Sequence, residues 1–412
     1  MTGYAKEFGL NWHTLLACAI GMSLGSAVSH YTMNLLGPAM LKEFGWSRAD
    51  FALIGSITLL TMPLIPLAGR FTDRFGSRVA AMVGFTVVPL GFIAYTFMSG
   101  SIVQFFAIYL VQHIFGVLTT TLVFARVIVE RFDAARGMAL SLLMTGPPLV
   151  AAIAVPLLGR LIREHGWRSG WLTLAALSAM AGIIAITVMG RSANKARPAR
   201  HEVHLGMGEF LALLRHPAFL LLVGGMILVN LPQVFVSSQM VLVVQESGVS
   251  EMLAAWMISF YSIGVIIGRF GTGLALDRVP ARAVALATLA IPAIGYLVLY
   301  STLTATCVLV GAVLIIGLAQ GAEGDIGSFL VSRKFRMKNF SLLQSFVTAS
   351  IGLGSAMGSL FMSFTLRRTE SYDSFLMLAA VTTVIGAVLI YLAARAPTVS
   401  DGPIEPEQGV FE

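Results

Sequence analysis

The feature that most constrains this chain is a series of twelve long apolar segments joined by short polar connections. Each segment is long enough to cross about 30 Å of hydrocarbon as an α-helix. Inside a bilayer such a helix satisfies all of its own backbone hydrogen bonds. We therefore predict an all-α membrane protein with twelve transmembrane helices, near 12–40, 50–69, 79–99, 102–125, 137–161, 169–190, 216–244, 252–275, 283–302, 305–332, 340–366 and 373–395.

The distribution of charge supports a membrane location and predicts an orientation. Only 11% of the residues are charged, whereas a soluble domain carries about 25%. With a cytoplasmic N-terminus, the inner connections hold 19 of the 27 Lys and Arg residues and the outer connections hold 7. The net charge of +7 therefore reflects the positive-inside rule and not binding to nucleic acid. We expect both termini in the cytoplasm and, from the short loops, a monomer in a bacterial inner membrane.

One turn motif occurs twice, 204 residues apart. The first copy is a Gly-x-x-x-Asp-Arg-x-Gly-x-Arg sequence that begins at Gly69, and the second begins at Gly273, with Pro280 in place of the second glycine. The repeat predicts a duplication, with six-helix bundles at 1–190 and 216–396, a cytoplasmic linker at 191–215 and a cytoplasmic tail at 397–412. Transporters built from two such halves bind their substrate at the interface near the membrane midplane.

Twelve spans, two six-helix halves and the duplicated turn resemble the major facilitator superfamily over essentially the whole chain. The resemblance implies alternating access, with the two turns as cytoplasmic gates. An Asp–Arg pair there can hold the two bundles together in one state and release them in the other. The alternative is that these charges only fix the topology. The predicted gating residues are Gly69, Asp73, Arg74, Arg78, Gly273, Asp277, Arg278 and Arg282.

Arg269 lies in the middle of the eighth apolar segment, about 12 Å before the second turn. A charge at this depth costs about 2.5–3.5 kcal/mol on insertion scales, so it needs a wet cavity, a partner or a ligand. Arginine always keeps its charge, and its planar fork matches a carboxylate. The segment 269–273, Arg-Phe-Gly-Thr-Gly, is similar to helix 8 of the monocarboxylate and oxalate transporter branch, which implies a small organic anion as substrate. The alternative is an ion pair within the second half.

Two carboxylates in the tenth segment, Glu323 and Asp325, are predicted near the depth of Arg269. Two residues apart means about 200° of rotation, so they cannot both face the cavity. Burial favours the protonated form of a carboxylic acid, so either could carry a coupled proton, and His113 is a further candidate. A static ion pair with Arg269 is the alternative.

Polar side chains on the remaining helices predict the walls of the cavity. Ser23, Ser26, His30 and Asn34 recur at spacings of 3, 4 and 4 residues, which is one face of a helix. The predicted substrate-binding residues are Arg269, His30, Tyr31, Asn34, Gln112, Asn230, Gln233, Tyr261 and Gln344. The Gly146-Pro147-Pro148 sequence in the fifth segment predicts a kink.

The chain has no Walker loop, HExxH or CxxC sequence, so we expect no enzymatic activity, cofactor or metal site. The predicted function is secondary active transport of a small organic carboxylate, preferably a monocarboxylate, with proton symport. An organic-anion exchanger or an efflux antiporter is the alternative. The expected partners are the organic anion, protons and membrane lipids.

Overall fold

The computed structural model describes residues 3–190, 214–301, 303–335 and 340–396, and these residues are helical with short connections. Within them, twelve helical segments are long and apolar enough to cross a membrane, which confirms the predicted architecture. Most of the predicted linker (191–213) and the whole predicted tail (397–412) lie outside the described residues.

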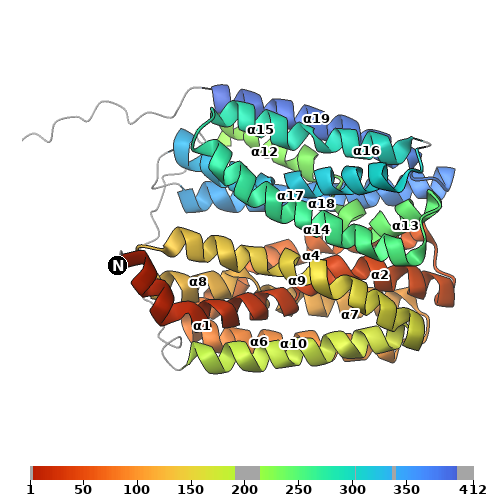
Figure 1. The fold of residues 1–412 in the computed structure, drawn as a ribbon, viewed down its shortest axis with the longest axis horizontal. Coiled ribbons are helices and arrows are strands. Elements are labelled where there is room, and N and C mark those ends of the chain that lie inside the picture. The colour runs from red at the N-terminus through yellow and green to blue at the C-terminus, as the bar shows by residue number, and fades with distance from the viewer. Residues whose placement is uncertain (1–2, 191–213, 302, 336–339, 397–412) are drawn as a thin grey trace, which may run out of the picture.

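The first six spans form one bundle, in the lower half of Figure 1. Its elements are α1 (Gly3–Leu24), α2 (Ala27–Phe44), α3 (Arg48–Ala52), η1 (Leu53–Ser56), α4 (Ile57–Thr61), η2 (Met62–Leu64), α5 (Ile65–Phe75), α6 (Ser77–Thr96), α7 (Ile102–Gly116), η3 (Val117–Thr119), α8 (Thr121–Arg131), α9 (Arg136–His165) and α10 (Trp167–Met189). We call it the N-terminal half.

The last six spans form the second bundle, in the upper half of Figure 1. Its elements are α12 (Pro217–Asn230), η5 (Phe235–Gln239), α13 (Met240–Glu246), α14 (Glu251–Leu276), α15 (Ala281–Ala290), α16 (Pro292–Tyr300), α17 (Thr306–Lys334), α18 (Phe340–Thr369) and α19 (Asp373–Arg395). We call it the C-terminal half.

Several spans that the sequence predicts as single helices are interrupted. The first span breaks at Gly25 and Ser26, between α1 and α2. The Ser26 hydroxyl donates to the carbonyl of Gly116 within the N-terminal half at 3.0 Å, whereas Asn34 reaches the other half. The break lies within the predicted polar face of Ser23, Ser26, His30 and Asn34, and a single cavity-lining face stays a prediction.

The packing of the two halves differs between the two ends of the molecule. At the end that holds Gly3 and Arg395 (the terminal end, left in Figure 1), each half has its own buried apolar cluster. Toward the other end (the far end), one cluster continues from Leu36 and Met40 in α2 to Val243 and Val244 in α13. The two halves therefore share a core only toward the far end.

Polar contacts also join the halves at the far end. Arg48 forms an ion pair with Glu246, and Arg367 forms one with Asp50 at 2.5 Å. The hydroxyl of Ser359 in α18 donates to the carbonyl of Ala52. Among the described residues, no hydrogen bond, ion pair or ring contact joins the halves at the terminal end. The molecule is thus in a state that is closed at the far end.

Asn34 forms a second buried polar link in this closure, and its side chain is fully buried. Its amide nitrogen donates to the Val236 carbonyl at 2.7 Å, and its oxygen accepts from the Met240 amide at 2.9 Å. Both backbone groups lie at the π-helical turn η5, which departs from the α-helical hydrogen-bond pattern. One side chain of the N-terminal half therefore satisfies two backbone groups of the C-terminal half.

Asn34→Ala is expected to shift the protein toward a state that is open at the far end. The substitution leaves the Val236 carbonyl and the Met240 amide without these partners in the closed state. Each unsatisfied group destabilises that state by about 1–3 kcal/mol. The ratio of open to closed molecules should therefore rise about fivefold or more. Spin labels at the exposed Lys42 and Glu251, in a cysteine-free background, should report a larger long-distance population. Thr32→Ala is the control, because this hydroxyl donates only to Val28 of its own helix. An unchanged distance distribution in Asn34→Ala would contradict a role in closure.

Candidate functional site

Helices α14 and α17 pack with their backbones in contact because each carries two glycines four residues apart, Gly264 and Gly268 in α14 and Gly317 and Gly321 in α17. A side-chain carbon added at Gly268 would overlap the backbone carbonyl of Leu318. The other three glycines meet a backbone carbonyl of the facing helix in the same way. A side-chain carbon added at Gly321 would lie 2.9 Å from the backbone nitrogen of Arg269. The close approach of the two helices therefore places Arg269 of α14 directly beside α17.

Arg269 is half-buried and carries no partner among the described residues. Its Nε atom is buried without a hydrogen bond. No described carboxylate oxygen lies within 4.0 Å of a guanidinium nitrogen, which is the distance limit for an ion pair. A guanidinium in the middle of a membrane-spanning helix is costly unless something satisfies it. The predicted ion pair within the C-terminal half is therefore not formed in this state.

The positive charge of Arg269 nevertheless acts on three nearby groups. They are the carboxylates of Glu323 and Asp325 in α17 and the phenol of Tyr31 in α2. Glu323 is only 7% exposed, whereas Asp325 is half-buried. The structure thus brings the predicted cationic and acidic residues together and adds one group from the other half.

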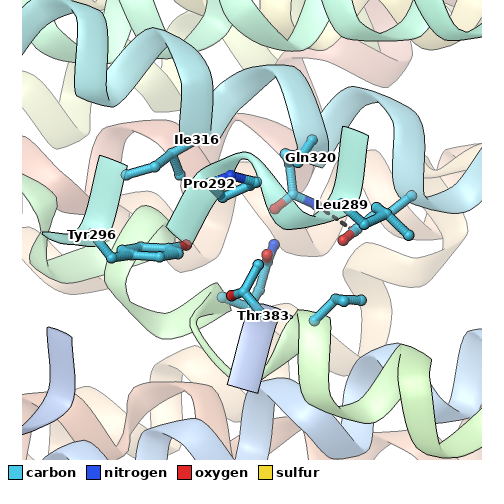
Figure 2. Close-up of a pocket in the computed structure, with 10 residues that line it drawn as sticks. Leu289, Pro292, Tyr296, Ile316, Gln320 and Thr383 are labelled. Atoms are coloured by element: carbon cyan, nitrogen blue, oxygen red, sulfur yellow. Dashed lines mark hydrogen bonds between the residues drawn. The ribbon is translucent and has the colours of Figure 1, made fainter. Parts of the chain in front are cut away.

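Glu323 lines a small polar cavity inside the C-terminal half (Figure 2). The amide nitrogen of Gln320 donates to its carboxylate at 2.5 Å, and Asn230 lies beside it. The cavity has a volume of about 20 Å³, which is about the space of one water molecule. Tyr296 and Thr383 also line it, so a water there would have the several polar partners that a buried water needs.

Tyr31 and Tyr261 meet where the two halves face each other beside Arg269. Their ring centroids are 6.4 Å apart, and His30 packs edge-on against Tyr31 at 5.1 Å. Tyr261 is 1% exposed, and its hydroxyl has no hydrogen-bond partner among the described residues. A buried hydroxyl without a partner is costly, so this group is available to a ligand that enters beside it.

Three further predicted residues lie on helices of the C-terminal half. Asn230 donates to its own helix at 2.9 Å, but its side-chain oxygen is buried without a partner among the described residues. Gln233 lines the cavity of Glu323. The side-chain oxygen of Gln344 in α18 is also buried and unpartnered in the described part of the chain. Two of the three therefore offer a free acceptor.

Gln112 and His113 of α7 are engaged inside the N-terminal half. The Gln112 amide donates to the Val88 carbonyl at 2.9 Å, and the His113 ring stacks on Tyr109 at 5.6 Å. The contacts described for both side chains come from their own half. The structure does not bring these two residues to Arg269, and their roles as ligand or proton sites stay predictions.

The two predicted gate turns make no described contact with each other. Asp73 forms an ion pair with Arg126 of α8, inside the N-terminal half. Asp277, Arg278 and Arg282 are exposed and have no bonded partner among the described residues. Gating by these turns stays a prediction.

The sequence analysis did not identify Gln320, Tyr296 and Thr383 as neighbours of Glu323. Gln320 could have been found, because residues three apart on a helix are neighbours. The other two come from α16 and α19 and carry no signal that links them to Glu323 in the sequence.

One known protein family matches nearly the whole chain. The family model of the Major Facilitator Superfamily matches residues 15–242 and 225–410. The chain belongs to this superfamily. Major facilitator proteins are transporters as a family, and the twelve membrane-spanning helices among the described residues make this chain a multi-pass membrane protein.

Relatives of this major facilitator protein include monocarboxylate transporters. Monocarboxylate transporter 13 of Bos taurus is 27% identical over 62% of this chain and 59% of the relative. Monocarboxylate transporter 4 of Rattus norvegicus is 32% identical over 42% of this chain and 36% of the relative. The matches therefore span less than two thirds of the length of these relatives.

A solved structure shares the fold of this major facilitator protein. It is a bacterial homologue of the human lysosomal transporter Spinster, in an inward-facing and unoccupied conformation. The superposition covers 96% of this chain and 98% of the chain in that structure, with a TM-score of 0.69 and 17% sequence identity. At this identity the likeness shows the fold alone.

Proposed function

We propose that this protein transports a small organic carboxylate, preferably a monocarboxylate, by alternating access. The observation that carries the proposal is the guanidinium of Arg269 within a membrane-spanning helix, whose buried Nε has no hydrogen-bond partner among the described residues. A carboxylate substrate supplies the missing partner, because its two oxygens match the planar fork of arginine. The similarity to monocarboxylate transporters supports the same substrate class.

The carboxylate is proposed to bind Arg269 with Tyr31 and Tyr261 on either side. The charge of Arg269 acts on Tyr31, and the hydroxyl of Tyr261 is buried without a partner in the described residues. Phenolic hydroxyls can donate to a carboxylate. Because one tyrosine comes from each half, the substrate would contact both moving parts, which couples its binding to the change of state.

Glu323 is the proposed proton carrier, and Asp325 is the proposed electrostatic partner of Arg269. Glu323 is buried in a cavity with room for about one water, and a buried carboxylic acid favours its neutral form. After substrate release, an ionised Glu323 would compensate Arg269 while the empty carrier returns. Symport follows, because anion and proton then move together.

The orientation of the protein in the membrane is part of the same proposal. We infer that the terminal end faces the cytoplasm of a bacterial cell, which makes the far end external and the present state inward-facing. The turns beginning at Gly69 and Gly273 would then close the cytoplasmic side in the opposite state, in a monomer made of an N-terminal bundle, a linker, a C-terminal bundle and a tail.

Anion exchange is the second candidate, and one observation favours it. Two carboxylates already lie within electrostatic reach of Arg269. If neither carboxylate takes up a proton during the cycle, transport is not coupled to protons, and one organic anion can be exchanged for another across the membrane.

Uptake into proteoliposomes tests the proposal and separates its two forms. A panel of labelled monocarboxylates, dicarboxylates and organic cations is offered with and without an inward proton gradient, and with and without an internal organic anion. Monocarboxylate uptake driven by the gradient supports symport. Uptake only into preloaded vesicles supports exchange, and uptake of the cations alone would overturn the proposal.

Glu323→Gln is expected to separate the two activities of the carrier. The amide keeps the size of the side chain but cannot carry the proton, so gradient-driven uptake should be lost. Exchange between two anion-loaded sides should persist, because Arg269 is unchanged. Asp325→Asn is the matched control and should leave the stimulation by the gradient in place. Equal loss of gradient stimulation in both variants would mean that Glu323 has no special role.

A further inference from the structure

A second cavity lies in the N-terminal half, away from the site of Arg269. Its volume is about 300 Å³, the lower end of the range for small-molecule pockets. Helices α9 and α10 form its sides, and residues near the α1–α2 break, among them Ser23, Val28 and Tyr31, form its inner wall. No described residue of the C-terminal half lines this lateral cavity.

The surface inside the lateral cavity is apolar. The serine and threonine hydroxyls among its lining residues are satisfied by their own helices, since Ser23 donates to Ala19 at 2.6 Å. Thr32 and Thr173 likewise donate to the carbonyls four residues earlier, at 2.9 and 2.8 Å. No charged side chain lines it. Apolar cavities of this kind stay free of water and take up apolar ligands.

The mouth of the lateral cavity is continuous with the lipid-facing surface. Leu157 lines the cavity and is also 66% exposed on the outside of a membrane-spanning helix. Ile153 beside it on α9 and Ile183 on α10 are exposed as well. In a bilayer this surface meets hydrocarbon, so lipid chains are the molecules present at the opening.

We propose that the lateral cavity binds an acyl chain of a membrane lipid. The chain enters between α9 and α10 and ends against the inner wall, where it contacts the back of Tyr31. The ring of Tyr31 lies beside Tyr261 and within reach of the charge of Arg269. An acyl chain in the cavity therefore supports the position of a residue in the candidate substrate site.

Photolabelling in proteoliposomes tests this assignment. The bilayer contains a phosphatidylcholine with a diazirine in its acyl chain, and labelled peptides are mapped by mass spectrometry after irradiation. Peptides of α9 and α10 that line the cavity should be labelled more strongly than the lipid-facing surface of α19. Ala154→Phe fills the cavity from α9, and Thr173→Phe fills it from α10. Each should reduce this labelling to the level of α19.

Ala176→Phe is the matched control, because Ala176 is exposed on α10 and does not line the cavity. It should leave the labelling unchanged. Two cavity-filling variants from different helices keep the test decisive if one of them fails to fold. Equal labelling of the wild type and the filled variants would mean ordinary surface contact with lipid and would overturn the proposal. Loss of labelling when a transported carboxylate is added would assign the cavity to the substrate and would also overturn it.

Discussion

Arg269→Gln is expected to abolish carboxylate uptake while the protein still folds. The substitution removes the permanent positive charge of the candidate site, where no other described Lys or Arg side chain lies. Truncating one partner of a buried charge pair costs about 2–5 kcal/mol, which is about 30-fold or more in affinity. Arg269→Lys keeps the charge but loses the planar fork, so it should show an intermediate loss. The measurement is initial uptake of the best monocarboxylate by each variant in proteoliposomes.

Stability and a control arginine separate binding from folding in this experiment. Arg269 has no bonded partner among the described residues, so removing its charge should leave the thermal stability unchanged or raise it. Arg160→Gln is the control, since Arg160 is exposed and pairs only with Glu164 of its own helix. Wild-type uptake by Arg269→Gln would remove the basis for an anion substrate.

Gly268→Ala is expected to reduce both stability and transport strongly. The added methyl group would overlap the backbone carbonyl of Leu318. A backbone atom cannot move aside as a flexible side chain can, so α14 and α17 must separate. Overpacking of this kind costs about 1–3 kcal/mol and sometimes more, and it would also move Arg269 away from Glu323. The measurements are the thermal denaturation midpoint and the initial rate of uptake.

The same helix provides the control for this prediction. A side-chain carbon at Gly271 would meet no atom within 4 Å. Alanine in place of glycine within a helix stabilises it by about 0.5–1 kcal/mol, so Gly271→Ala should be neutral or slightly stabilising. If Gly268→Ala and Gly271→Ala behave alike, the close contact between α14 and α17 does not hold the site together.

The sequence was sufficient to predict the twelve spans and the all-helical architecture, because span length and apolar composition depend only on the bilayer. It did not predict the interruptions within the spans. Gly25 in the first span and Pro292 in the ninth are residues that commonly interrupt helices, and each lies at an observed break. The π-helical turn at 235–239 had no such signal. Its backbone groups are satisfied by Asn34, 202 residues earlier, so it depends on contact between the halves.

The candidate site was predicted in part. The cost of a charge in the membrane singled out Arg269, and the matching depth in α17 singled out Glu323 and Asp325. The sequence could not tell which acid is buried, because that depends on the rotation of α17 relative to its neighbours. Nor could it show that Asn34 is used to close the far end, since a polar residue on an apolar helix suits a ligand and a helix contact equally well.

Equilibrium binding by calorimetry tests the central claim most directly, because it does not depend on turnover or vesicle orientation. The purified wild-type protein and Arg269→Gln are titrated with the best-transported monocarboxylate and with its uncharged amide. The wild type should bind the acid and not the amide, and Arg269→Gln should bind neither. Equal binding of the acid by both proteins would contradict the assignment of Arg269 as the anion site.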